Sequence, residues 1–134
     1  MLHMERLLSM SRSYHCPACG PALHQNPAVT EAAVAGLRWW VGHGYKDPNW
    51  WWMDIGLPQY AGAIGILLNG TVPAADTENL TRLMDPAGDG TKGDGENLLW
   101  QQQVAISREV LRGNVSFVAE LFGKMWSHVE FETG

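Results

Sequence analysis

The chain has 134 residues, a hydrophobic fraction of 46% and a formal net charge of −5. This length suits one domain or a part of a larger one, and the hydrophobic fraction is ordinary for a globular protein. A negative chain without a basic run argues against nucleic-acid and anionic-membrane binding, and no stretch reaches the roughly 20 apolar residues that span a membrane. The first residues, M-L-H-M-E-R, lack the features of a signal peptide, so either the protein is cytoplasmic or its true N-terminus is missing.

Residues 2–14 are predicted to form a helix with an apolar side, and two prolines and a glycine after His15 end it. Cys16 and Cys19, flanked by His15 and His24, would make up most of a zinc site. The second Cys/His pair that structural zinc needs is absent, so we expect no metal. The alternatives are a plain loop with two thiols and, in a secreted protein, an exposed disulfide.

Asn26 and Pro27 predict the start of a second helix, with Asn as the N-cap and Pro at the first helical position. This helix is expected to run to about residue 41 and to end at the Gly-His-Gly run of residues 42–44. We expect a long loop from 42 to about 54 that carries three consecutive tryptophans.

Residues 56–68 predict a third helix that is apolar on all sides and therefore buried, with Gly62 and Gly65 allowing close approach of neighbouring helices. A shorter helix follows over residues 74–84. The loop over residues 85–96 alternates Asp and Gly, but the ligand pattern of a calcium-binding EF-hand does not fit in register. A long glycine-rich loop in a helical fold is more often part of a binding site.

Asn97 is expected to open the fifth helix, which runs to about Arg112. After Gly113-Asn114 a last helix is predicted from apolar residues at helical spacing: Val118, Leu121, Phe122, Met125 and Val129. No strand pattern is convincing. The sequence thus predicts an all-α fold of six helices in three antiparallel hairpins.

The tryptophan cluster points to a function. Adjacent residues on a helix point about 100° apart, so one core cannot easily receive Trp50, Trp51 and Trp52 together. An exposed row of flat rings with polar edges suits sugar rings, whose faces are apolar and whose rims are polar. The alternative is that the indoles only wedge between helices.

Residues 49–59, N-W-W-W-M-D-I-G-L-P-Q, resemble the mark N-W-W-D-x-E-I-G-x-P of polysaccharide lyase family 8, which includes hyaluronate, chondroitin AC and xanthan lyases. A second, weaker mark of that family, T-G-A-N with a Trp three residues on, resembles residues 94–100, D-G-E-N-L-L-W. The resemblance covers most of the chain. It implies a single partial α/α-toroid domain over residues 1–134.

The resemblance also implies a mechanism. These enzymes cleave a glycosidic bond next to a uronic acid by β-elimination, with an Asn that binds the uronate carboxyl and a Tyr and a His that move protons. Asn97 matches the Asn, and Trp50 and Trp51 match the aromatic patch that guides the polymer. Asn49, Trp52 and Trp100, from the same two marks, complete the predicted substrate-binding set.

The sequence departs from the family at several positions. Trp52 replaces an Asp, Asp54 replaces a Glu, and Glu96 stands where the Ala precedes Asn97. The proton-transferring His and Tyr have no counterpart, and neither His43 nor His128 is placed in their role. We therefore expect a lyase fragment that does not depolymerise its polymer alone.

The expected partner is an acidic polysaccharide of the glycosaminoglycan or xanthan kind, with no cofactor and an extracellular location by family resemblance. The isolated chain is expected to self-associate. The alternative functions are a non-catalytic helical carbohydrate-binding protein and a part of another α/α-toroid enzyme such as a glycosidase. A glycosidase needs two facing carboxylates, for which only Asp54 and Glu96 are candidates.

Overall fold

A computed structural model describes residues 2–91 and 93–127 of the chain, and all the regular structure in these ranges is helical. Six α-helices run from α1 to α6: Leu2–Tyr14, Pro27–His43, Leu57–Leu67, Ala74–Leu83, Gly95–Arg112 and Val115–Ser127. Three short helical turns accompany them: η1 at Pro17–Cys19, η2 at Trp52–Gly56 and η3 at Asp85–Ala87. The predicted all-α fold is confirmed. His128 and Val129, which the sequence places in or next to the last helix, lie outside the described residues.

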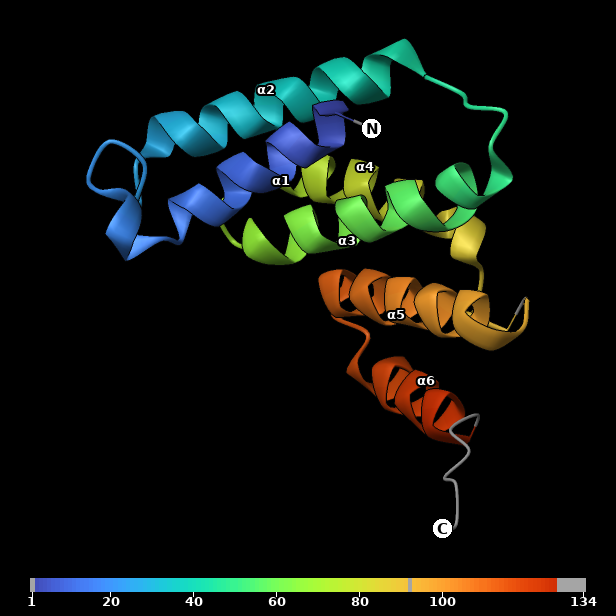
Figure 1. The fold of residues 1–134 in the computed structure, drawn as a ribbon. Helices are drawn as coiled ribbons and strands as arrows, with labels where there is room; N and C mark the ends of the chain where they lie inside the picture. The colour runs from blue at the N-terminus through green and yellow to red at the C-terminus, as the bar shows by residue number, and fades with distance from the viewer. Residues whose placement is uncertain (1, 92, 128–134) are drawn as a thin grey trace, which may run out of the picture.

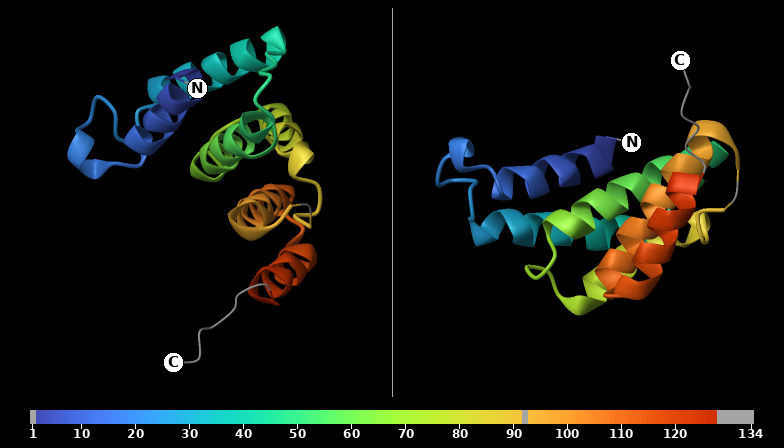
Figure 2. Two further views of the ribbon diagram at one scale, coloured as in Figure 1. Left: turned by 45° about the vertical axis from the view of Figure 1, so that its right-hand side comes forward. Right: turned by 90° about the horizontal axis from the view of Figure 1, so that it is seen from below.

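The helices form a row of antiparallel pairs (Figure 1). Helix α1 packs against α2, α3 against α4, and α5 against α6, so each hairpin is a unit. Helices α1, α3 and α5 also contact one another in succession, while α2 contacts α4 behind them. Figure 2 shows the pairs following one another, with α1 and α2 at one end of the row and α6 at the other. This repeat of helix pairs in two layers is the arrangement that the sequence predicted for part of a toroid.

Local chemistry accounts for most helix boundaries. Asn26 caps α2, because its side chain accepts a hydrogen bond from the Ala28 amide, and Pro27 occupies the first helical position. Helix α2 continues to His43, two residues beyond the prediction, and ends where Gly44 takes a left-handed conformation. Helix α5 begins at Gly95, so Asn97 lies inside its first turn and does not open it.

The predicted loop over residues 42–54 is partly wrong. The chain is non-helical only over residues 44–49, and it is helical from Trp50 onward through the π-helical turn η2 into α3. Pro58 lacks an N–H, so the usual bond to the carbonyl of Asp54, four residues earlier, cannot form. The wider π turn lies where the helical ladder is interrupted in this way, and the Leu57 amide bonds the carbonyl of Trp52.

Helix α3 lies at the centre of the core, as its apolar composition predicted. Ile64 and Leu68 are fully buried among side chains from α1, α2, α4 and α5, although Ile66 on the other side is exposed. Gly62 and Gly65 permit the close approach of α5, because an added Cβ would lie 3.0 Å from the Cβ of Ser107 and 2.5 Å from a methyl of Leu111. The main core residues are Met4, Leu7, Leu37, Trp52, Leu57, Ala61, Ile64, Leu68, Leu80, Met84 and Val104.

Polar contacts join the layers. Arg38 on α2 donates two hydrogen bonds, at 2.9 and 2.8 Å, to the carboxylate of Asp76 on α4. This bidentate geometry fixes the direction of both side chains, and it satisfies a carboxylate that is buried.

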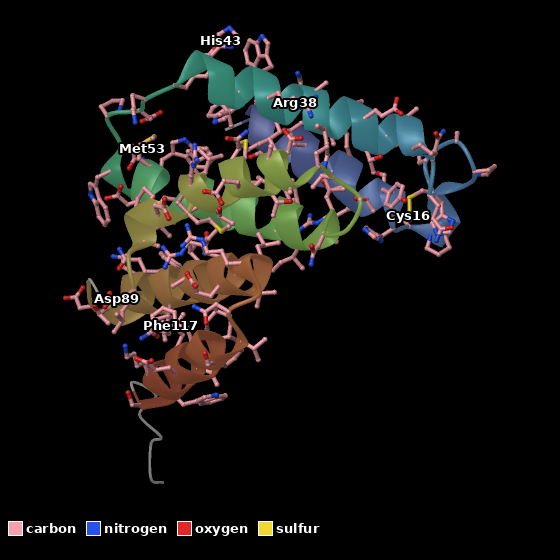
Figure 3. The ribbon with its side chains drawn as sticks, turned by 180° about the vertical axis from the view of Figure 1, so that it is seen from behind. Cys16, Arg38, His43, Met53, Asp89 and Phe117 are labelled. Carbon is pink, nitrogen blue, oxygen red and sulfur yellow. A yellow bond between two sulfur atoms is a disulfide. The ribbon has the colours of Figure 1, made fainter. Side chains whose placement is uncertain are left out.

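In the loop between α1 and α2, Cys16 and Cys19 form a disulfide, visible in Figure 3 at the far end of the molecule from His43. Of the sequence-based alternatives for these thiols, the structure contains the disulfide.

No helix in the described part of the chain combines the length and apolarity needed to cross a membrane.

Apolar surface is exposed at the end of the row of helix pairs. Helix α6 packs on α5 and buries Leu121. Val115 and Trp126 on α6 remain 77% and 60% exposed, and Phe122 is exposed beside them.

We expect the isolated chain to self-associate at micromolar concentration through this face of α6, because burying a few hundred Å² of apolar surface at about 25 cal/mol per Å² is worth several kcal/mol. Light scattering over a concentration series measures the effect. The substitutions Val115→Lys and Phe122→Lys should reduce association, whereas Leu23→Lys, at an exposed position in the loop between α1 and α2, should not. A monomer at every concentration would show that this face does not drive association.

Candidate functional site

The predicted site residues lie on two segments that the fold brings together. Asn49 to Trp52 enter η2, and Asn97 and Trp100 lie in the first two turns of α5. Helix α5 packs on η2, and the rings of Trp51 and Trp100 meet edge to face with centroids 5.5 Å apart. This geometry is a favoured one for aromatic pairs. The two sequence marks, separated by about 40 residues, therefore form one surface.

The three consecutive indoles point to different environments, as the helical geometry predicted. Trp50 is 58% exposed, Trp51 is half-buried against Trp100, and Trp52 is only 6% exposed. Trp52 packs in the core and its ring lies 5.7 Å from that of Tyr60. Trp50 and Trp51 are thus the members of the cluster with surface available to a ligand, and Trp52 supports them from below.

Gly56 explains how two indoles fit around one helical turn. A Cβ added at this position would lie 2.7 Å from a ring carbon of Trp52 and 2.9 Å from a ring carbon of Trp51. Both distances are far below ordinary carbon contacts, so the two rings occupy the space that any side chain would fill. The backbone of Gly56 is ordinary helix, so the requirement for glycine here is one of space.

Asn49 has a structural task at the start of this segment. Its side-chain oxygen accepts a hydrogen bond from the Trp52 amide at 3.3 Å, and its carbonyl accepts one from the Met53 amide. These bonds satisfy donors at a helix start. Asn49 itself is held by Asp47, whose side chain accepts from the Asn49 amide at 2.8 Å. The predicted binding residue thus also acts as a cap that orients the tryptophans.

The glycine-rich loop lies against the first turns of α5. Gly90 has a positive φ of 73°, and an added Cβ would lie 2.8 Å from the Cα of Gln102, so the loop backbone lies directly on the helix. Gly93 lies close to Asn97 and Gln101. Within the part of the chain that the structure describes, the buried Oε1 of Gln101 has no hydrogen-bond partner. Asn97 is half-buried beneath this loop, whereas Glu96 is exposed.

A charged network anchors η3, which leads into the loop, to α5. Glu109 accepts hydrogen bonds from Arg108 at 2.8 Å, from Arg112 at 3.3 Å and from Asn114 at 3.2 Å. Arg112 also donates to Asp85 of η3 at 3.0 Å. Burial alone would raise the pKa of Glu109, but the hydrogen bonds from Arg108 and Asn114 and the two positive charges outweigh it and hold the pKa below its ordinary value.

Other titratable groups take structural roles. The hydroxyl of Tyr60 donates to Glu5 at 3.3 Å, and burial together with the Glu5 carboxylate raises the pKa of Tyr60. Asp89 in the loop binds the amide and hydroxyl of Thr91, and the hydroxyl bond lowers the pKa of Asp89. Among the described residues, no cluster of three or more His, Cys, Asp and Glu side chains is placed to hold a metal ion.

Sequence reasoning missed two features of this end of the molecule. One is the steric role of Gly56, whose signal was its fixed place in the tryptophan mark. The other is a group of stacked rings around Trp39, His43 and Tyr45 next to the site. No linear signal marks that group, because its members come from α2 and from the loop that follows it.

Comparison with known proteins agrees with this fold. Residues 1–110 match the model of the N-terminal alpha-helical domain of polysaccharide lyase family 8, and both sequence marks lie within the match. The chain belongs to this family. A search of curated proteins finds no match.

A solved structure of xanthan lyase from Paenibacillus is similar, with a TM-score of 0.76 and 24% sequence identity. The similarity covers 90% of this chain and 12% of the xanthan lyase chain, so the present chain spans about one eighth of that protein. At this identity the likeness shows the shared helical fold.

The substitution Gly56→Ala should lower the free energy of unfolding by about 1–3 kcal/mol, because the methyl group must displace the rings of Trp51 and Trp52. Gly123→Ala is the matched control: it lies within helix α6 and its Cβ would meet no atom within 4 Å. It should stabilise by up to about 1 kcal/mol. Thermal or urea unfolding compares the two. Equal stability of Gly56→Ala and wild type would contradict the steric explanation.

The lowered pKa of Glu109 predicts a pH dependence of stability. The unfolded chain binds a proton at Glu109 more readily than the folded chain does. The stabilising contribution of the ionised Glu109 carboxylate is therefore present above about pH 4.3 and is lost as the pH falls through the lower folded pKa. Glu109→Gln should be less stable than wild type by about 1–3 kcal/mol at pH 7. The difference should narrow toward pH 3 in urea unfolding. Glu31→Gln, which changes an exposed carboxylate on α2, is the control and should leave stability at pH 7 unchanged.

Proposed function

We propose that this chain forms part of the substrate cleft of a polysaccharide lyase and binds an acidic polysaccharide at the surface shared by η2 and α5. The observation that carries the proposal is the contact between Trp51 and Trp100, which joins the two family marks into one surface. Trp50 offers an exposed ring beside it. In this assignment the indoles of Trp50, Trp51 and Trp100 bind the faces of sugar rings. Asn49 and Trp52 hold the indoles of this segment in position.

Asn97 has the role of binding the uronate carboxyl. In β-elimination the C5–H proton leaves, a double bond forms between C4 and C5, and the C4–O bond breaks. Negative charge builds on the carboxyl group as the proton leaves, so an amide N–H directed at the carboxyl lowers the barrier. Asn97 is half-buried under the glycine-rich loop, where such a hydrogen bond is less exposed to water. Proton transfer is not assigned to any residue of this chain.

The neighbouring Glu96 is compatible with this role. A carboxylate that faced the uronate would repel it. Adjacent helical residues diverge by about 100°, and Glu96 is exposed where Asn97 is half-buried. Glu96 therefore points to solvent, where salt screens its charge over about 8 Å at physiological ionic strength.

The family match favours a lyase over the glycosidase alternative. A non-catalytic carbohydrate-binding role stays as the second candidate, because the chain holds one matched catalytic position and spans 12% of the solved xanthan lyase. An extracellular location belongs to the same proposal. Both candidates require binding of a polymer, so binding is the property to test first.

Affinity electrophoresis in gels that contain xanthan, hyaluronan or chondroitin sulfate measures the dissociation constant from retardation. We expect retardation by at least one of these polymers. Trp50→Ala should weaken binding about tenfold, which corresponds to about 1.4 kcal/mol. Trp126→Ala, which removes an equally exposed indole from α6, should leave binding unchanged.

Asn97→Ala tests the carboxyl contact. It should weaken binding of the acidic polymer about tenfold and leave binding of the same polymer with its carboxyl groups reduced to alcohols unchanged. Equal losses on both polymers would contradict the carboxyl role of Asn97. Absence of retardation by all three acidic polymers would overturn the proposed function.

A further inference from the structure

A second group of aromatic rings lies at the C-terminal end of α2, outside the two family marks. We call Trp39, His43 and Tyr45 the outer platform. The rings of Trp39 and His43 have centroids 4.1 Å apart, and those of His43 and Tyr45 are 5.6 Å apart and within 7° of parallel. Trp39 is 48% exposed and Tyr45 is 45% exposed. Large rings are thus presented to solvent side by side.

The outer platform is held in place from within. His43 donates a hydrogen bond from Nδ1 to the carbonyl oxygen of Trp39 at 2.7 Å. On the inner side, the ring centroids of Tyr45 and Trp40 are 5.0 Å apart, and Trp40 packs against the core. His3 of α1 stacks on Trp40 and contacts Trp39. Rings fixed in this way lose little freedom when a ligand binds, which lowers the entropic cost of binding.

The outer platform lies at the same end of the molecule as the proposed substrate surface. The end of α2, the turn η2 and the start of α5 lie on the same side of the molecule (Figure 1). Figure 3 shows His43 and Met53 at this same end. A pocket of about 120 Å³ lies between Tyr45, at the edge of the outer platform, and the turn η2, and is lined by Trp40, Tyr45, Lys46, Asp47, Trp52 and Met53.

The chemistry of the outer platform fits a sugar ring. Trp, His and Tyr each combine a flat apolar face with a polar edge, which matches the apolar C–H face and hydroxyl rim of a pyranose. Lys46 and Asp47 are both exposed at the margin, carry opposite charges and supply a donor and an acceptor. The local charge is therefore close to balanced, which suits a neutral pyranose better than a second uronate.

We propose that Trp39, His43 and Tyr45 form an outer sugar-binding subsite that takes a neutral pyranose of the same polysaccharide chain whose uronate lies at Asn97. The inference rests on the proposed function, because the two sites must share one polymer. The subsite adds affinity for long chains by a second attachment point, in addition to the contacts around Trp50.

The test compares a long and a short ligand. The probes are the polymer that retards wild type most strongly and a uronate-containing disaccharide from it, measured by affinity electrophoresis and by NMR titration. Trp39→Ala and Tyr45→Ala should each bind the polymer about tenfold more weakly and the disaccharide as wild type does. Trp50→Ala should weaken both, and Trp126→Ala neither. Trp39→Phe, which keeps a flat ring, should retain most of the polymer affinity.

The other possible results would contradict the outer subsite. Unchanged polymer binding by Trp39→Ala and Tyr45→Ala, with Trp50→Ala impaired, overturns the outer subsite and leaves the proposed function standing. Equal losses for polymer and disaccharide indicate general damage and also overturn it. Reduced self-association without a change in polymer binding would show that protein covers these rings instead. If wild type binds no acidic polymer, both proposals fail. Tyr45→Ser, in the loop after α2, provides the same comparison if Trp39→Ala does not fold.

Discussion

The steric constraint at Gly56 organises this end of the molecule. Because Gly56 has no side chain, the rings of Trp51 and Trp52 both pack against its Cα in one helical turn. One of these consecutive tryptophans can therefore be buried in the core while the other stays near the surface. Trp52 fills the core below, while Trp51 is left half-buried where it can meet Trp100 of α5. The π turn begins at Trp52, directly after Trp51, and lies where Pro58 interrupts the helical ladder. The position of the candidate sugar-binding rings thus depends on a residue with no side chain.

The remainder of the site is held by contacts that fix backbone. Gly90 brings the loop directly onto α5, and the network around Glu109 ties the preceding turn to the same helix. These contacts place the backbone at Gly90 and Gly93 against the first turns of α5, where Asn97 lies. Pre-organisation of this kind is what an enzyme needs where charge develops during reaction. The half-buried position of Asn97 next to this anchored backbone is compatible with the proposed carboxyl-binding role.

The fold and the family together indicate how a polymer could be handled. A row of helix pairs places one end of each pair on the same side, so aromatic residues near those ends collect on one surface. Six of the seven tryptophans belong to the end of α2, the segment entering α3, and the start of α5. The rings among these that reach the surface, such as Trp39 and Trp50, suit a long chain better than a small ligand, because several weak contacts act together. This supports a polysaccharide as the partner.

The sequence by itself determined the helices and the family. Hydrophobic spacing, the Asn26 cap and the glycine stops are local signals, and they placed six helices correctly to within a few residues. The two family marks also identified the residues that converge. The tertiary structure alone decided which tryptophan is exposed, why Gly56 is required, and that Trp39, His43 and Tyr45 stack beside the site. The loop predicted over residues 42–54 was wrong from Trp50 onward. The helix there buries Trp52 in the core and packs Trp51 against Trp100, and these contacts come from helices distant in the sequence.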